Sequence, residues 1–259
     1  MINIQGHFSK IAYHYKSLRI IDLEPVLYIK HQLDGLPKIQ AADVGCGTGR
    51  YDLLLFQYLG NRLNLYCIDN NKEMLEQVNN YLIQNKIKNF KVELCSAGSL
   101  PFFNESLDCI FSFNAIHHFK IRDFLNEVSR ILKSSGSLFI YTRSRTQNRR
   151  NIWGKYFPLF SEKETRLYEP DEFREILKEI PELEIRNIVF FNNKRVADLD
   201  LLVRRAQNYH YSTFCLYNED EFRKSLNQFI ENLQHNFQDL NHIAWYDENI
   251  LYIIKNQIG

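Results

Sequence analysis

The sequence predicts an α/β fold in which a doubly wound, mostly parallel β-sheet carries helices on both faces. Two observations lead to this prediction. The stretch from Ala41 to Arg50 is an apolar run that ends in an acid and then places glycines at alternate positions, which is typical of a buried strand, a tight turn and a helix start. Apolar runs then alternate with helical stretches as far as Thr142, an order that favours parallel strands joined by helices.

Length and composition limit the possible classes. A chain of 259 residues suits one α/β domain with an insertion, and a net charge of +1 argues against a general attraction to nucleic acid or membranes. We find no run of eighteen apolar residues and no basic-then-apolar leader at Met1, so we expect a cytoplasmic protein without a membrane span. The cysteines are scattered without a Cys-x-x-Cys pair, so we expect neither a metal site nor a disulfide.

The glycine-rich turn is the first candidate site. Gly45, Gly47 and Gly49 permit backbone conformations barred to other residues and let a ligand approach closely, while the following helix directs free N–H groups at the same crevice. A dinucleotide-binding turn needs Gly or Ala at the sixth position, where Arg50 stands. The Gly-Lys-Ser/Thr ending of a P-loop is also missing. The turn therefore predicts a different ligand.

With glycine at the first, third and fifth positions after an acid, this stretch resembles motif I of the class I S-adenosylmethionine-dependent methyltransferases. The alternative is an ordinary glycine-rich turn. The resemblance, which extends over roughly residues 8–142, is to methyltransferase type 11 and ubiquinone/menaquinone-type members. It implies a Rossmann-like seven-stranded sheet with an antiparallel last strand, S-adenosylmethionine as cofactor and S-adenosylhomocysteine as product. It also assigns cofactor binding to Asp43, Gly45, Cys46, Gly47 and Gly49.

Helices are expected over Phe8–Arg19 and Leu23–Leu33. The first is similar to a family segment that folds over the cofactor, with Ala12, Tyr15 and Arg19 matching it. We keep Tyr15 as a candidate substrate-binding residue. The alternative is that Tyr15 only packs its helix on the sheet.

A second strand over Leu63–Ile68 ends at Asp69. Asp69 stands twenty residues after Gly49, close to the separation at which an acid reaches the ribose hydroxyls of a bound nucleotide. A carboxylate accepts two hydrogen bonds from a vicinal diol. Asn70 is expected to open the next helix in a capping box with Glu73, and is a further candidate cofactor contact.

The third strand, over Phe90–Cys95, leads into a loop that begins Ser96-Ala97-Gly98 and resembles the family's Asp-Ala-x-x-Leu-Pro-Phe loop. In the family the Asp of this loop holds the adenine amino group. Ser96 replaces it here, and a hydroxyl accepts a hydrogen bond more weakly than a carboxylate. We therefore expect adenine binding by Ser96 and Ala97 to depend on backbone groups and apolar stacking.

The fourth strand is expected over Ser106–Ser112, and the segment after it should face the same crevice as the glycine turn. Asn114 is a candidate cofactor contact. His117 is the candidate catalytic base, because a neutral imidazole can take a proton from the methyl acceptor, whereas His118 is expected to turn into the next helix. The His-His-Phe sequence is similar to ubiquinone/menaquinone-type enzymes and to tRNA wobble-uridine methyltransferases.

A helix over Asp123–Leu132 and a fifth strand over Ser137–Tyr141 complete a core of residues 1–142. Residues 143–259 should add the remaining strands to the same domain, with insertions at about 143–180 and 195–240 that cover the substrate as a lid. We expect a helix at Pro170–Ile180, a strand at Leu183–Asn192, and at Asn241–Lys255 strands or a hairpin with a turn near Trp245–Asn249.

Three residues of this second part are candidates for substrate binding. Arg143 opens a basic run and could bind a carboxylate or phosphate through its guanidinium group, although a charge run is usually a solvated face. His210 and Tyr211 lie in an aromatic segment of the lid, and the alternative is that this segment forms the lid's own core.

The sequence thus predicts a methyltransferase that acts on a small or medium-sized metabolite, mainly by aligning acceptor and methyl donor. One alternative is a tRNA methyltransferase of the wobble-uridine type, against which the low net charge argues. Another is a non-catalytic protein that binds S-adenosylmethionine. The acceptor, the methylated atom and the oligomeric state cannot be derived from the sequence.

Overall fold

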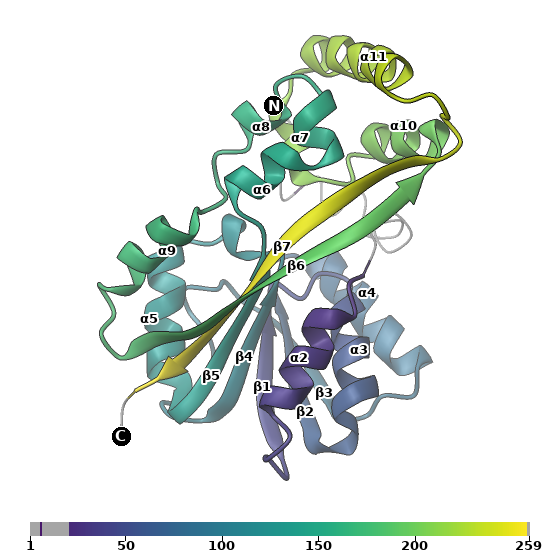
Figure 1. Ribbon diagram of the computed structural model, residues 1–259. Helices are drawn as coiled ribbons and strands as arrows, with labels where there is room; N and C mark the ends of the chain where they lie inside the picture. Colours follow the sequence, from purple (N-terminus) through teal and green to yellow (C-terminus); the bar gives the residue numbers. More distant parts are fainter. Residues whose placement is uncertain (1–5, 7–20, 258–259) are drawn as a thin grey trace. The chain divides into compact units, whose positions relative to one another are not determined.

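The structure, a computed structural model, describes residue 6 and residues 21–257 (Figure 1). The chain divides into two compact units. We call Ile21–Thr142, Pro170–Phe190 and Ile250–Gly259 the sheet unit, and the remainder, chiefly Arg143–Glu169 and Phe191–Asn249, the helical unit. That both belong to one domain, with the insertions acting as a lid, stays a prediction.

Seven strands form one sheet in the order β3-β2-β1-β4-β5-β7-β6. Their bounds are β1 Ile39–Val44, β2 Leu63–Asp69, β3 Phe90–Leu94, β4 Leu107–Phe113, β5 Leu132–Thr142, β6 Leu183–Ala197 and β7 Ile243–Asn256. Strands β1 to β5 pair with one another in parallel, and β7 pairs antiparallel with β5. The predicted Rossmann-like sheet with an antiparallel last strand is confirmed. The order reverses at β1, which is the point where such sheets bind ligands.

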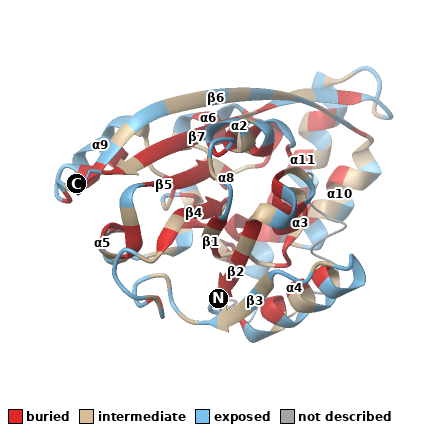
Figure 2. Ribbon diagram, turned by 90° about the horizontal axis from the view of Figure 1, so that it is seen from below, coloured by how far each residue is buried: buried red, intermediate tan, exposed pale blue. Residues whose placement is uncertain are grey.

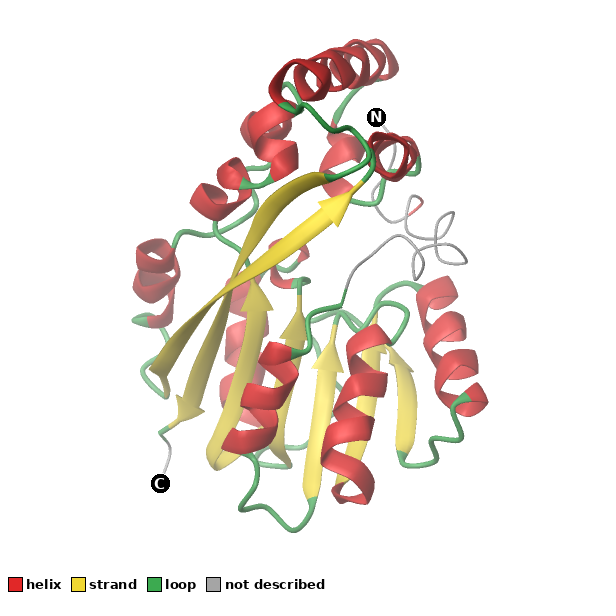
Figure 3. Cartoon of the chain, turned by 45° about the vertical axis from the view of Figure 1, so that its right-hand side comes forward, coloured by secondary structure: helices red, strands yellow, loops and turns green. Residues whose placement is uncertain are grey.

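The described part of the sheet unit contains the α-helices α2 Glu24–Gln32, α3 Arg50–Leu59, α4 Lys72–Gln84, α5 Ile121–Ile131 and α9 Pro170–Leu177, and the short 3₁₀ helices η1 Gly60–Arg62 and η2 Ile116–His118. Helices α3 and α4 lie on one face of the strands, and α5 and α9 on the other (Figure 2). All of β1 except Gln40 and all of β4 except Asp108 is buried. Strands covered by helices on both faces are expected to be largely buried, as these two are, and Figure 3 shows helices in front of the strands and behind them.

The helical unit contains α6 Arg145–Arg150, α7 Ile152–Tyr156, α8 Phe160–Lys163, α10 Leu199–Gln207, η3 Ser212–Leu216 and α11 Glu219–Asn236. Its core is aromatic, with Trp153, Phe157, Phe160, Phe214 and Phe229 buried together. The rings of Trp153 and Phe229 stack with centroids 5.0 Å apart. Helix α11 begins with a capping box formed by Asn218 and Glu221.

Two local predictions are wrong for identifiable reasons. The cap of α4 is Asn71, whose side chain accepts the Met74 N–H at 2.9 Å, because Asp69 Oδ1 accepts the Asn71 N–H and shifts the helix start by one residue from Asn70. The turn expected near Trp245–Asn249 lies inside the continuous strand β7. There Asp247 accepts hydrogen bonds from Trp245 Nε1 and from Arg195 of β6, so its polar side chain does not require a turn.

Two strands are also longer than expected. Strand β5 begins at Leu132, so it includes Gly136, and β6 continues past Asn192 to Ala197. The helix expected over Phe8–Arg19, together with Tyr15, lies outside the described residues.

Candidate functional site

The glycine turn between β1 and α3 has the conformation that only glycine adopts readily. Gly45, Gly47 and Gly49 have φ values of 78°, 55° and 76°. A Cβ atom at Gly45 would lie 2.5 Å from the Ala115 Cβ, and one at Gly49 would lie 2.3 Å from Val78 Cγ2. A Cβ at Gly47 would meet no heavy atom within 4 Å, so this residue leaves room for an approaching ligand.

Asp69 holds this turn in place. Its Oδ2 accepts the Gly47 N–H at 3.0 Å, and its Oδ1 accepts the Asn71 N–H at 3.0 Å. Burial raises the pKa of Asp69, and the backbone hydrogen bonds from Gly47, Asn71 and Asn70 lower it in part. Each carboxylate oxygen has a second lone pair for a ligand hydroxyl. The ribose contacts of Asp69 and the cofactor contact of the exposed Asn70 stay predictions.

A pair of buried acids lies beneath the turn. Asp43 is 2% exposed and Asp52, on α3, is fully buried. Asp52 forms hydrogen bonds with Asp43 and with the Cys67 thiol, and no N–H donor of the described residues reaches Asp43 Oδ1 or either Asp52 oxygen. Burial and the neighbouring Asp52 raise the pKa of Asp43 well above its usual range, and burial raises the pKa of Asp52 to about 6. Burial therefore favours the neutral forms of these carboxyl groups, and a cationic ligand group placed here would favour their charged forms.

Sequence reasoning missed Asp52, although an acid within the run Tyr51-Asp52-Leu53-Leu54-Leu55 was a usable signal. Cys46, the other predicted contact of the turn, is partly buried, and burial raises the pKa of its thiol well above the usual range. A protonated thiol leaves Cys46 neutral beside the two acids.

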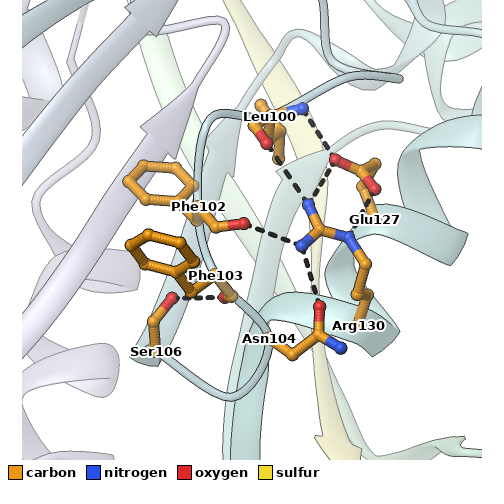
Figure 4. Close-up of polar contacts among 7 residues, drawn as sticks. All are labelled: Leu100, Phe102, Phe103, Asn104, Ser106, Glu127 and Arg130. Carbon is orange, nitrogen blue, oxygen red and sulfur yellow. Dashed lines mark hydrogen bonds and ion pairs between the residues drawn. The ribbon is translucent and has the colours of Figure 1, made fainter.

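The loop after β3 contains the predicted adenine contacts Ser96 and Ala97. Ser96 is exposed and Ala97 is partly exposed, and the Ser99 N–H donates to the Ser96 carbonyl at 3.1 Å. Two side chains of α5, Glu127 and Arg130, hold the loop through its backbone (Figure 4). Sequence reasoning missed both, because charged residues on an amphipathic helix usually form its solvated face.

Asn114 follows β4 directly and has a left-handed backbone, with φ at 54°. This conformation costs about 1 to 2 kcal/mol for a residue with a Cβ and is found preferentially at functional sites. The Asn114 N–H donates to the Tyr141 carbonyl at 2.7 Å, which fixes the residue at the carboxyl edge of β4 and β5.

His117 and His118 belong to a short 3₁₀ helix, η2, at Ile116–His118, and their ring centroids lie 4.1 Å apart. His117 is partly buried, whereas His118 is exposed. Helix α5 begins at Ile121, and the expectation that His118 turns toward this helix stays a prediction. The role of His117 as a base stays a prediction.

The structure brings the three substrate candidates of the helical unit together. The guanidinium carbon of Arg143 lies 5.5 Å from the centroid of the Tyr211 ring, and the Tyr211 and His210 rings are 4.3 Å apart. His210 is buried against Trp153, with its Nδ1 3.0 Å from the Arg205 carbonyl. His210 thus lies in the aromatic core of this unit, as the alternative interpretation expects, while Arg143 and Tyr211 are partly exposed.

The basic run that begins at Arg143 does not form one patch. Arg145 donates to the Leu167 carbonyl at 2.5 Å, and Arg150 forms a two-pronged ion pair with Glu248. A further buried acid, Glu164, accepts hydrogen bonds from Arg166 and Thr213. Arg145, Arg150 and Arg166 therefore stabilise the helical unit itself.

No group of three or more His, Cys, Asp or Glu residues in the described part of the chain is arranged to hold a metal ion. No helix in residues 21–257 is long and apolar enough to cross a bilayer. The cytoplasmic location stays a prediction.

Comparison with known proteins identifies related sequences and folds. Residues 42–140 match the family described as methyltransferase domain. A tRNA (carboxymethyluridine(34)-5-O)-methyltransferase of Mus musculus is 29% identical over 154 residues, which are 58% of this chain and 21% of the relative. The uncharacterized methyltransferase YcgJ of Bacillus subtilis is 31% identical over 99 residues, which are 38% of this chain and 38% of the relative.

The crystal structure of YcgJ superposes on this chain with a TM-score of 0.65 at 18% identity, and covers 91% of this chain and 99% of that one. At this identity the likeness shows a shared fold. The match to each of the two curated relatives spans less than half of the relative's length.

Proposed function

Because the chain belongs to the class I S-adenosylmethionine-dependent methyltransferases, whose domain it carries at residues 42–140, we propose that it methylates a small or medium-sized metabolite. S-adenosylmethionine supplies a methyl group that is already activated on a sulfonium, and S-adenosylhomocysteine is the product. The chain itself then has to bind the cofactor and the acceptor, align them for methyl transfer and exclude water from the site.

The residues of the sheet unit fit this cofactor. S-adenosylmethionine carries positive charge at its amino group and sulfur, and no cationic side chain of the described residues pairs with the buried acids Asp43 and Asp52. Asp69 is placed to accept the ribose hydroxyls beside Gly47, where the turn leaves room. The loop at Ser96 supplies backbone groups for the adenine.

His117 is our candidate for the proton-accepting group. It follows β4 at the carboxyl edge of the sheet, on the segment that begins with the strained Asn114. A neutral imidazole can accept the proton that an acceptor hydroxyl or amine loses on methylation. Arg143 and Tyr211 are our candidates for binding an anionic group of the acceptor.

The observation that favours a metabolite over RNA as the acceptor is that basic residues of the helical unit form ion pairs with acidic residues of the same unit. Arg150 pairs with Glu248, Lys163 with Glu221, Arg166 with Glu164 and Arg195 with Asp247. The side chains of Arg195 and Asp247 are only 12% and 11% exposed. Binding to RNA relies on Lys and Arg side chains that neutralise phosphates, and these side chains are already neutralised.

A tRNA acceptor is the second candidate, favoured by the mouse relative and by the sequence His117-His118-Phe119. The two candidates are separated by labelling. The protein is incubated with S-adenosylmethionine labelled in its methyl group and with a cell extract divided into a fraction of small molecules and a fraction of RNA. We expect label in the small-molecule fraction that is lost with His117→Ala. Label in RNA, with a rate that falls steeply as salt is added, would overturn the proposal in favour of tRNA.

A further inference from the structure

The loop that joins β3 to β4 is held by two charged side chains from α5. Glu127 Oε2 accepts the Leu100 N–H at 2.7 Å. Arg130 donates to the Phe102 carbonyl at 2.7 Å, to the Leu100 carbonyl at 3.2 Å and to Asn104 Oδ1 at 3.0 Å. Figure 4 shows the guanidinium group reaching across the turn of the loop, so that one planar group binds several of its polar atoms at once.

The two side chains also fix each other. Arg130 Nε and Nη2 each donate to a carboxylate oxygen of Glu127 at 2.8 Å. The Arg130 side chain is 33% exposed and the Glu127 side chain 18%. The hydrogen bond from Arg130 lowers the pKa of Glu127, with a smaller contribution from the Leu100 N–H. A two-pronged ion pair of this kind has a defined geometry, which neither lysine nor glutamine reproduces.

The part of the loop that precedes Leu100 packs closely on the same helix, α5. A Cβ atom at Gly98 would lie 2.9 Å from the Asp123 Cβ, so the backbone there lies against the start of α5. The loop also offers no acidic side chain at Ser96, so adenine recognition depends on where its backbone N–H and C=O groups lie. Their position is in turn determined by α5.

We propose that Glu127 and Arg130 are positioning residues for adenine recognition, holding the backbone of residues 96–102 in the shape that recognises the base. This proposal rests on the proposed function, and specifically on this loop as the adenine site. The two residues act through the loop and are not catalytic.

The test compares two ligands that differ only at the base, S-adenosylhomocysteine and S-inosylhomocysteine, in which an oxo group replaces the adenine amino group. Dissociation constants are measured by calorimetry for the wild type, Arg130→Gln and Glu127→Gln. We expect the wild type to prefer the adenine ligand, and both variants to lose about 5- to 10-fold of that preference, the size of one or two hydrogen bonds. Arg130→Lys should also lose it, because the ammonium group cannot bind both carbonyls.

The matched control is Arg122→Gln on the same helix. Arg122 forms a two-pronged ion pair with Glu179 at 2.5 and 2.6 Å, and Glu179 lies outside the loop. It should retain the wild-type preference, even where its melting temperature falls as much as that of Glu127→Gln. An equal weakening of both ligands in Arg130→Gln and Glu127→Gln, with the preference unchanged, would mean a merely structural role and overturn the proposal. A wild type that binds neither ligand would instead refute the proposed function.

Discussion

The buried pair Asp43 and Asp52 leads to a prediction about stability and pH. In the unfolded chain both carboxyls titrate near pH 4. In the folded protein burial raises the pKa of Asp52 to about 6, and burial and the neighbouring Asp52 raise the pKa of Asp43 well above its usual range. Between these values the folded state holds protons that the unfolded state has released. The free energy of unfolding therefore falls as the pH rises, by up to about 1.4 kcal/mol per pH unit for each proton.

Asp52→Asn should remove much of this dependence. The shift of Asp52 alone corresponds to about 2 to 3 kcal/mol lost between pH 4 and pH 7. The asparagine amide is neutral, nearly isosteric, and can donate to Asp43 Oδ1. Without cofactor, we expect Asp52→Asn to be more stable than the wild type at pH 7.5 by about 1 to 3 kcal/mol, and about equal to it at pH 5.

The assay is urea unfolding of the protein without cofactor at pH 5, 6, 7 and 8, followed by circular dichroism. The matched control is Asp108→Asn, at a partly exposed carboxyl of β4 that is paired with Lys133. Wild-type and Asp52→Asn stabilities that change in parallel with pH would refute the reasoning. A wild type whose free energy of unfolding rises from pH 5 to pH 8 would also refute it.

Three further predictions concern single residues. Gly49→Ala should lower the free energy of unfolding by at least about 2 kcal/mol, because the new Cβ would meet Val78 at 2.3 Å. Gly47→Ala has open space around it and should cost only about 1 kcal/mol, for its left-handed backbone. Equal losses of stability for the two variants in thermal unfolding would argue against this account of the turn. His117→Ala should lower kcat by about 10²- to 10⁴-fold and leave the affinity for S-adenosylhomocysteine within about twofold, and unchanged turnover on the identified acceptor would exclude His117 as the base. Phe157→Ala should lower the free energy of unfolding by about 3 to 5 kcal/mol, because Phe157 is buried in the aromatic core of the helical unit, and a loss below 1 kcal/mol in urea unfolding would contradict that packing.

The elements of the sheet unit follow from local patterns, which is why the sequence predicts them. A glycine turn after a buried strand, and apolar runs that end in acids, depend on residues close together in the chain. The correction at β7 arises where a distant partner decides, whereas the cap of α4 depends on the nearby Asp69. Asp247 remains inside β7 because Arg195, on β6, donates to it, and no pattern near Trp245 indicates that contact.

The candidate site shows the same division. Asp69 and the three glycines are recognisable because their spacing is short and their chemistry is specific. Glu127 and Arg130 are not, since their partners Leu100 and Phe102 lie 27 to 30 residues earlier in the chain. The association of Arg143 with Tyr211 likewise joins residues that sequence spacing cannot relate.

The most direct test of the central claim is a calorimetric titration of S-adenosylmethionine and S-adenosylhomocysteine into the protein, with Asp69→Asn as the comparison. Asparagine keeps an oxygen for the Gly47 N–H, which Asp69 accepts at 3.0 Å, but it loses the charge and part of the acceptor capacity for the ribose. We expect one molecule bound per chain and an affinity that the substitution lowers by about 1 to 3 kcal/mol. Absence of binding to the wild type, or binding that Asp69→Asn leaves unchanged, would contradict the assignment of the cofactor site.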